Sequence, residues 1–212
     1  MINTVIFDIG GVIVGNVFLS EDKAAQFATL VGADVKEMRE AREHYWDKFK
    51  TGKMTEREFW AGILSRLGQD PTEEKISRLS QLAYSFTVPL EENVELVKEL
   101  REEWRYRLIT LNDEAKEFND YRKQQLGLEN LFEFWITSCD VGCSKPDKKI
   151  YEIALERLKE KPETCVFIDD QEENLFPARD LGIHAIHYQT PQQLRSDLAK
   201  LGVYVKGEAI AR

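Results

Sequence analysis

The chain has 212 residues, of which 42% are hydrophobic and 32% charged, and its formal net charge at pH 7 is -9. This composition is typical of a folded globular protein and argues against a disordered chain and against a membrane protein. The acidic balance argues against a nucleic-acid partner, because phosphate backbones are bound by basic surfaces, but it leaves a small anionic substrate open.

The first predicted strand is the apolar run Val5–Phe7, and it ends in a single carboxylate, Asp8. Gly10 and Gly11 follow almost at once. Backbone N–H groups around these glycines can approach a ligand closely, because no side chain obstructs them. The stretch therefore predicts a catalytic aspartate on a loop that handles phosphate.

Residues 16–88 form a region without a clear strand signal, and several helix signals predict a helical insert there. Thr55–Glu58 fits a capping box, and Gly52 just before it suits a helix stop or a turn. Apolar residues at helical spacing are Ala24, Phe27, Ala28 and Val31, then Phe59, Trp60, Ile63, Leu64 and Leu67, then Ile76, Leu79 and Leu82. We expect this insert to be a cap on a core formed by residues 1–15 and 89–212.

The chain after the insert alternates between helical patterns and short apolar runs. Leu90–Glu103 and Lys148–Lys159 have helical spacing. The apolar runs are Tyr106–Leu111, Phe134–Thr137, Cys165–Ile168 and Ala185–Tyr188. These runs are mostly non-alternating and rich in β-branched or aromatic residues, as in strands buried on both faces. The pattern predicts an α/β fold with a doubly wound parallel sheet.

Polar residues follow the predicted strands at the points where they end. They are Asp8 after the first strand, Thr110 and Asn112 at the end of the second, Lys145 after the third, and Asp169 with Asp170 after the fourth. Ligands of open parallel sheets bind outside the carboxyl ends of the strands, so we expect these side chains to converge. Thr110 and Asn112 share a face of their strand, and the sequence does not choose between them.

At these positions the chain resembles the haloacid dehalogenase-like (HAD) superfamily, over nearly its whole length. The resemblance rests on "DIGGV", "KPDKKIY" and "IDDQEENLFPARDLG" at their mutual spacing. It implies a Rossmann-like core, with Asp8 as nucleophile, Thr110 or Asn112 at the second motif, and Lys145 at the third. The insert is similar to the helical caps of the branch that includes sugar-phosphate phosphatases and epoxide hydrolase N-terminal domains.

The chemistry of these residue types is that of a phosphatase. A carboxylate can attack phosphorus and form an aspartyl-phosphate that water hydrolyses. An anion that attacks an anion needs cations, and Mg²⁺ held by oxygen ligands is the usual solution. Asp8 and Asp169 could supply ligands, with Asp170 close by, while Lys145 would neutralise phosphate charge and restrain Asp8. We expect Mg²⁺-dependent hydrolysis of a small phosphorylated metabolite.

Gly10 departs from the family pattern. The resemblance implies an aspartate there, whose backbone carbonyl binds Mg²⁺ and whose side chain protonates the leaving group. Gly10 keeps the carbonyl and lacks the side chain, so we expect metal binding to survive. General acid–base catalysis contributes ~10²–10⁴-fold, so turnover should be slower without loss of nucleophilic attack.

Two alternative functions stay open. One is a HAD hydrolase that attacks carbon, such as a dehalogenase, although the acidic pair Asp169-Asp170 favours a metal and counts against it. The other is a non-catalytic protein of the same fold that binds phosphate and metal. Substrate choice is expected to lie in the cap, where the candidates for substrate contact are His44, Tyr45, Trp46 and Lys48.

The cysteines and the remaining histidines are expected to be structural. Cys139, Cys143 and Cys165 form no disulfide framework, and we expect buried thiols. His184 and His187 lie on one predicted strand and point to opposite faces. Apolar runs fall short of the ~18 residues that span a bilayer. The N-terminus lacks the basic region of a signal peptide, so we expect a cytoplasmic protein.

Overall fold

A five-stranded sheet organises the computed structural model, which describes residues 1–17, 20–103 and 105–205. The strands are β1 (Thr4–Phe7), β2 (Arg107–Asn112), β3 (Phe134–Thr137), β4 (Cys165–Asp169) and β5 (His184–His187). They are all parallel and lie in the order β3-β2-β1-β4-β5. Each of the predicted runs is a strand, with some bounds shifted by a residue, and the doubly wound parallel sheet is confirmed.

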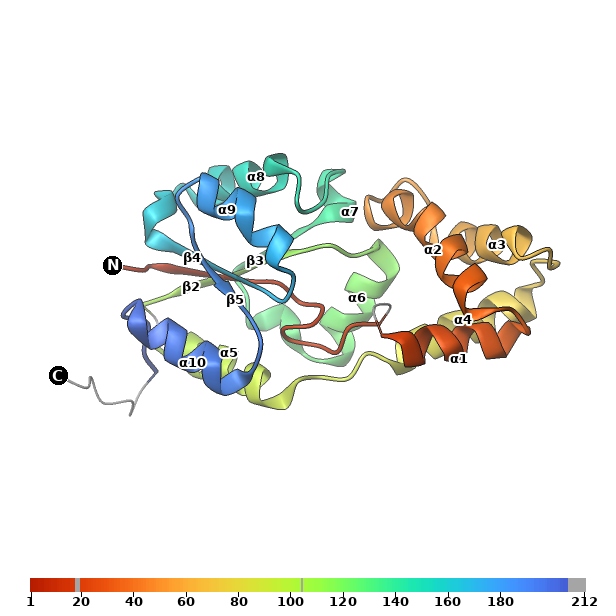
Figure 1. Ribbon diagram of the computed structural model, residues 1–212. Coiled ribbons are helices and arrows are strands. Elements are labelled where there is room, and N and C mark those ends of the chain that lie inside the picture. The colour runs from red at the N-terminus through yellow and green to blue at the C-terminus, as the bar shows by residue number, and fades with distance from the viewer. Residues whose placement is uncertain (18–19, 104, 206–212) are drawn as a thin grey trace.

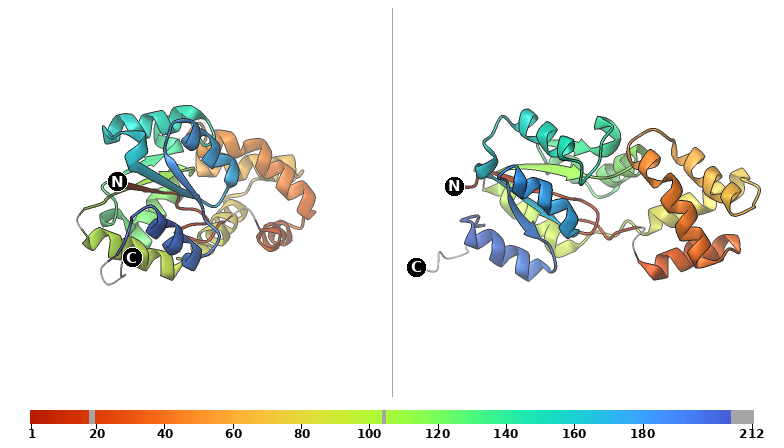
Figure 2. Two further views of the ribbon diagram at one scale, coloured as in Figure 1. Left: turned by 60° about the vertical axis from the view of Figure 1, so that its left-hand side comes forward. Right: turned by 45° about the horizontal axis from the view of Figure 1, so that its top comes forward.

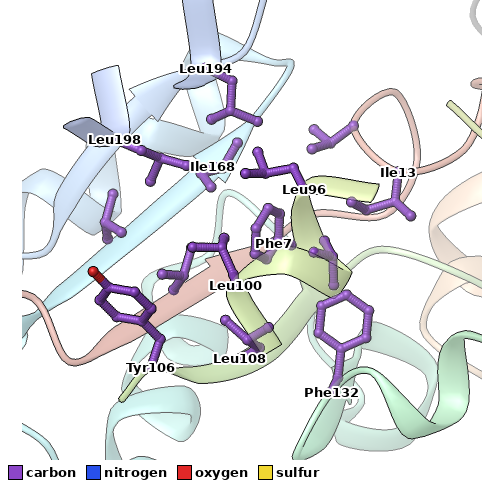
Figure 3. Packing of buried hydrophobic residues seen from close by; sticks show 14 of the residues in the cluster. Phe7, Ile13, Leu96, Leu100, Tyr106, Leu108, Phe132, Ile168, Leu194 and Leu198 are labelled. Carbon is purple, nitrogen blue, oxygen red and sulfur yellow. The ribbon is translucent and has the colours of Figure 1, made fainter. Parts of the chain in front are cut away.

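Helices cover both faces of this sheet (Figure 1). One face carries α5 (Glu91–Glu102) and α10 (Pro191–Lys200), and the other carries α8 (Lys148–Leu158) and α9 (Leu175–Asp180). Phe7 packs with the first pair of helices, in the cluster of Figure 3, whereas its neighbour Ile6 packs with the second pair. Successive strand residues face opposite layers, which explains why the runs are mostly apolar on both faces.

Further helices connect these layers to the insert. The core contains α6 (Lys116–Gln125), α7 (Ser138–Val141) and short 3₁₀ turns at Leu128–Asn130, Pro162–Thr164 and Glu172–Asn174. The insert contains α1 (Glu21–Val31), α2 (Val35–Lys50), α3 (Glu56–Arg66) and α4 (Glu73–Ser85). The insert helices lie together at one end of the molecule in both views of Figure 2. None of the helices in the described residues is long and apolar enough to cross a bilayer.

The insert helices pack around one hydrophobic cluster. The predicted capping box is present at the start of α3, where Glu58 N–H donates to Thr55 Oγ1 and Thr55 N–H donates to the Glu58 carboxylate. The apolar stripe that follows it is buried except for half-buried Leu67, and Phe59 stacks on Phe49 with ring centroids 4.1 Å apart. Phe118 of α6 belongs to the same cluster, so the insert packs directly on the core.

The two segments that join insert and core run side by side. Val14 and Pro89 form an antiparallel bridge, and Gly15 N–H donates to Val88 O at 2.8 Å. The division that the sequence predicts, between residues 15 and 16 and between residues 88 and 89, lies next to this bridge and stays a prediction. The chain therefore leaves the core and returns to it at one place, beyond the carboxyl end of β1.

The cysteines have free thiols, as the sequence predicts. Cys143 and Cys165 are buried, while Cys139 is half-buried. Burial and the neighbouring Asp140 carboxylate raise the pKa of the Cys139 thiol to about 12. Such a thiol is protonated at neutral pH and is a poor nucleophile.

Candidate active site

Lys145 lies between two carboxylates at the carboxyl ends of the central strands. Its Nζ is 2.9 Å from Asp8 Oδ1 and 2.6 Å from Asp169 Oδ2. The two aspartates are neighbours because β1 and β4 pair in a register that places Phe7 beside Ile168. All three charged side chains are buried. The structure thus brings together three of the residues that the sequence singled out, although they are far apart in the chain.

Asp170 adds a third carboxylate to this group. Asp8, Asp169 and Asp170 each offer an oxygen, and these oxygens lie within 4.8 Å of one another. Asp169 is fully engaged, since its oxygens accept from Lys145 Nζ, Asn174 Nδ2 and Gln171 N–H. By contrast, Asp170 Oδ1 is buried and accepts no hydrogen bond from the residues that the structure describes. The carboxylate best placed to take a further ligand is therefore Asp170.

The crowding of these acids perturbs their ionisation. Burial raises the pKa of Asp8 well above its ordinary value, against the effect of Lys145, and the Asp169 and Asp170 carboxylates raise it further. Burial and Asp169 also raise the pKa of Asp170. Burial alone would lower the pKa of Lys145, but the carboxylates of Asp169 and Asp8 outweigh it and the pKa is raised.

A divalent cation fits this group of residues. It would relieve the repulsion among the carboxylates and favour their ionised forms, including that of Asp8. Carboxylate oxygens, one of them without a partner, are the donors that hard cations such as Mg²⁺ prefer. The chemistry of the donor set and the orphaned oxygen of Asp170 thus agree with the metal that the sequence predicts.

The glycine loop after β1 has two distinct positions. Gly11 has φ +82°, and a Cβ there would lie 2.2 Å from Asp170 Oδ2. A Cβ on Gly10 would meet nothing closer than Arg122 Nη1, at 3.8 Å. The sequence suggests phosphate-facing N–H groups at both glycines, but Gly11 N–H donates to Val14 O at 2.7 Å. Gly11 instead leaves room for the Asp170 carboxylate, because the loop curls back on itself.

The difference between the two glycines can be tested by alanine. We expect Gly11→Ala to weaken Mg²⁺ binding by roughly tenfold or more, because the new methyl group displaces Asp170, a change comparable to losing a supporting group of a metal ligand. Gly10→Ala is the matched control, since its methyl group makes only ordinary contacts, and its Mg²⁺ affinity should stay within about twofold. Calorimetric titration with Mg²⁺ measures both, and equal affinities would contradict the assignment.

Thr110 and Asn112 share a face of β2, as predicted. Thr110 Oγ1 donates to Asn112 Oδ1 at 3.2 Å, and Thr137 Oγ1 approaches the same oxygen at 3.4 Å. Both residues are buried, and neither is among the described residues that line the cleft above the site. The hydroxyl groups orient the Asn112 amide, and which of the two residues contacts a phosphoryl group stays a prediction.

A cleft of about 290 Å³ lies over these residues, between core and insert. It is lined from the core by Asp8, Gly10, Asp113, Glu114, Arg122, Lys145 and Asn174, among others, and from α2 by Arg42, Trp46 and Lys50. Its volume is at the lower end of the ~300–1,000 Å³ typical of small-molecule sites. The cleft is therefore the size of a small metabolite.

The α2 residues of this cleft differ in part from those the sequence suggested. Of the four cap candidates, Trp46 lines the cleft, His44 and Lys48 are exposed, and the Tyr45 ring lies on Gly62 inside the insert. Arg42 and Lys50 were missed, yet each is four residues from Trp46 and so shares its helix face. That spacing is the signal that finds them.

Two acids that follow β2 were also missed. Asp113 Oδ1 accepts from Lys145 N–H at 3.0 Å and Oδ2 accepts from Lys50 Nζ at 3.3 Å, so this side chain joins the Lys145 loop to the insert. Glu114 forms a buried ion pair with Arg122 of α6. Burial raises the pKa of both carboxyl groups, although each has a cationic partner. Their place just beyond a strand end could have identified them.

Comparisons with known proteins identify a family. A model of the haloacid dehalogenase-like hydrolase family matches residues 2–182. Flavin mononucleotide hydrolase 1 of Arabidopsis thaliana is 26% identical over 207 residues, which cover 94% of this chain and 78% of that protein. Bifunctional epoxide hydrolase 2 of Mus musculus is 36% identical over 96 residues, 44% of this chain. The match covers 17% of that epoxide hydrolase, so the chain resembles only a small part of it.

Solved structures show the same fold. A HAD-family enzyme from Bacteroides thetaiotaomicron, crystallised with magnesium and inorganic phosphate, has a TM-score of 0.71. The two proteins are 21% identical, and the superposition covers 89% of this chain and 95% of the other. The likeness extends over core and insert together.

Proposed function

The chain belongs to the haloacid dehalogenase-like hydrolase family, and from this premise we propose that it is a Mg²⁺-dependent phosphatase of a small phosphorylated metabolite. The observation that carries the proposal is the group formed by buried Asp8, Lys145 and Asp169 with half-buried Asp170, whose Oδ1 has no hydrogen-bond partner among the described residues. The flavin mononucleotide hydrolase and the magnesium and phosphate complex among its relatives support the same reaction class.

In this proposal each charged residue has a separate task. Asp8 is the nucleophile, and Lys145 holds its carboxylate in place and offsets the charge of the incoming phosphate. Asp169 is a positioning residue, because its oxygens already accept from Lys145, Asn174 and Gln171. Asp8, Asp170 and the backbone carbonyl of Gly10 are the groups that would hold Mg²⁺. When bound, Mg²⁺ supplies positive charge that offsets the phosphoryl oxygens.

The cleft has room for a small substrate, with its phosphate at the end where Asp8 lies. Trp46 and Arg42 line the insert side of the cleft, with the Arg42 guanidinium 5.6 Å from the Trp46 ring centroid. The part of the substrate beyond the phosphate would meet these groups, so α2 is proposed to set substrate choice. This agrees with the division into a core for chemistry and a cap for selection.

The experiment is phosphate release from aryl, acyl and sugar phosphates by the wild-type chain, with Mg²⁺ and with excess chelator. Turnover of at least one class with Mg²⁺ and none with chelator is the expected result. Halide release from haloacids without Mg²⁺ would instead indicate a hydrolase that attacks carbon. Binding of Mg²⁺ and phosphate with no turnover of any class would indicate a non-catalytic protein.

A further inference from the structure

Arg122 is a buried guanidinium beside the glycine loop, in the same cleft as Asp8. It comes from the last turn of α6 and is 4% exposed. Its Nη1 lies 3.8 Å from the position that a Cβ on Gly10 would occupy. Its Nε is also buried, and no hydrogen-bond partner among the described residues accepts from it. Buried donors of a charged group rarely stay unpaired, so an incompletely satisfied guanidinium in a reaction cleft points to a ligand.

Among the residues that the structure describes, one carboxylate forms an ion pair with this guanidinium. Glu114 forms an ion pair with Arg122 Nη1 and also accepts from Ala115 N–H at 3.3 Å. A guanidinium has five N–H donors, so one carboxylate contact leaves further donors for a second anion. The ion pair fixes the position of the side chain and leaves some of its N–H donors available for another anion.

Besides Arg122, the cations among the described residues that line the cleft are Arg42, Lys50 and Lys145, and each has another partner. Arg42 Nη2 lies 3.8 Å from Glu43 Oε1, and the guanidinium lies 5.6 Å from the Trp46 ring centroid. Lys145 Nζ contacts Asp8 and Asp169, on the nucleophile side of the cleft. Lys50 Nζ lies 3.3 Å from Asp113 Oδ2 and 3.4 Å from an Asp47 oxygen. Among these groups, Arg122 is the one that faces the open position at Gly10.

That position matters for the leaving group. When Asp8 attacks phosphorus, the leaving oxygen must lie roughly in line on the opposite side, which is the cleft side of the site. Negative charge builds up on this oxygen as its bond to phosphorus breaks, and it needs either a proton or a fixed positive charge. Gly10 carries no proton donor, and it places no side chain between Arg122 Nη1 and the cleft.

We propose that Arg122 is a catalytic residue that stabilises the negative charge of the leaving oxygen, in place of a proton donor at position 10. The inference rests on the proposed phosphatase function. Asp8 attacks phosphorus, and the bond to the leaving oxygen breaks with both electrons on that oxygen. The alkoxide formed beside Arg122 takes a proton from water. The resulting hydroxide attacks phosphorus of the aspartyl-phosphate, and the Asp8 carboxylate leaves with its electron pair.

The test is the dependence of kcat/KM on the leaving group, measured with aryl phosphates of graded leaving-group pKa and one alkyl phosphate. Arg122→Met should lose roughly 10²–10³-fold on the alkyl phosphate, as for the loss of one charge-stabilising donor, and under tenfold on p-nitrophenyl phosphate. Glu114→Gln/Arg122→Met should show the same steeper dependence without leaving a lone buried carboxylate. Arg107→Met is the matched control, because Arg107 pairs with Glu133 at the amino end of β2.

A second variant, Gly10→Asp, keeps Arg122 and tests the inference by neutralising its positive charge. The Cβ of Gly10→Asp would bring a carboxylate within ion-pair reach of Arg122 and neutralise it, so alkyl phosphate turnover should not rise. A rise, or an equal loss on aryl and alkyl phosphates in the Arg122 variants, would overturn the inference. Phosphate release by the wild-type chain separates the two proposals, since its complete absence contradicts the phosphatase function itself.

Discussion

Replacement of Asp8 by asparagine is expected to lower kcat by roughly 10⁴-fold or more, as for removal of a nucleophile in other covalent enzymes. An amide does not attack phosphorus, whereas its shape and its Oδ1 contact with Lys145 are retained. The fold should be unaffected, because burial and the Asp169 and Asp170 carboxylates, which raise the pKa of Asp8, oppose its negative charge, and Lys145 keeps Asp169 as a charged partner. Phosphate release and thermal unfolding, measured side by side, check both statements.

The matched control for this variant is Asp147→Asn. Asp147 is the N-cap residue of α8 and accepts from Lys149 N–H, a task that asparagine performs equally well. Its kcat should stay within about twofold of wild type. Retention of more than a tenth of wild-type turnover by Asp8→Asn would exclude an aspartyl-phosphate on this residue.

Replacement of Lys145 by methionine is expected to lower the unfolding free energy by about 3–5 kcal/mol. The variant should also lose turnover. The change leaves Asp8 and Asp169 buried without their shared cation, and breaking a buried ion pair from one side is strongly destabilising. Urea denaturation measures the free energy. A loss below about 1 kcal/mol would show that the carboxylates are already neutral or solvated in the folded protein.

Two further variants test whether the loss of stability comes from the unpaired buried charge. Lys148→Met removes an exposed lysine three residues along the chain, 3.7 Å from Glu152, and should change the unfolding free energy by less than about 0.5 kcal/mol. Lys145→Met/Asp8→Asn removes one of the two stranded carboxylates and should recover part of the stability lost by Lys145→Met. Absence of recovery would mean that the lost packing of the lysine chain, and not the unpaired charge, explains the effect.

The sheet and the residues at its edge could be predicted because their signals are local. A strand buried on both faces needs apolar residues throughout, so the composition of Val5–Phe7 and Cys165–Ile168 is enough to predict them as strands. A parallel sheet brings its carboxyl ends to one edge, so Asp8 and Asp169 were expected to meet once both were placed after strands. The bounds of β2 and β5 moved by a residue because register with the neighbouring strand decides where pairing ends.

The roles within the site depended on contacts that no local pattern contains. Asp169 and Asp170 are adjacent in sequence, but only the fold shows that Asn174 and Lys145 satisfy the first while an oxygen of the second is unpartnered. Gly11 likewise leaves room for a side chain more than a hundred residues away in the sequence. These distinctions depend on the positions of the side-chain tips in the folded protein. The spacing of residues along a strand does not specify those positions.

For this chain the sequence by itself determined the fold class, the helical insert and the set of charged residues at the edge of the sheet. The periodicity of apolar residues and the ends of strands are signals within short sequence segments, so they can be predicted without a structure. The tertiary structure decided which groups share the cleft. Arg122 lies in the last turn of a polar helix without a motif, and its nearness to Gly10 arises only when α6 is packed near the loop after β1. The glycine that leaves the first motif without an acid thus stands beside a buried cation.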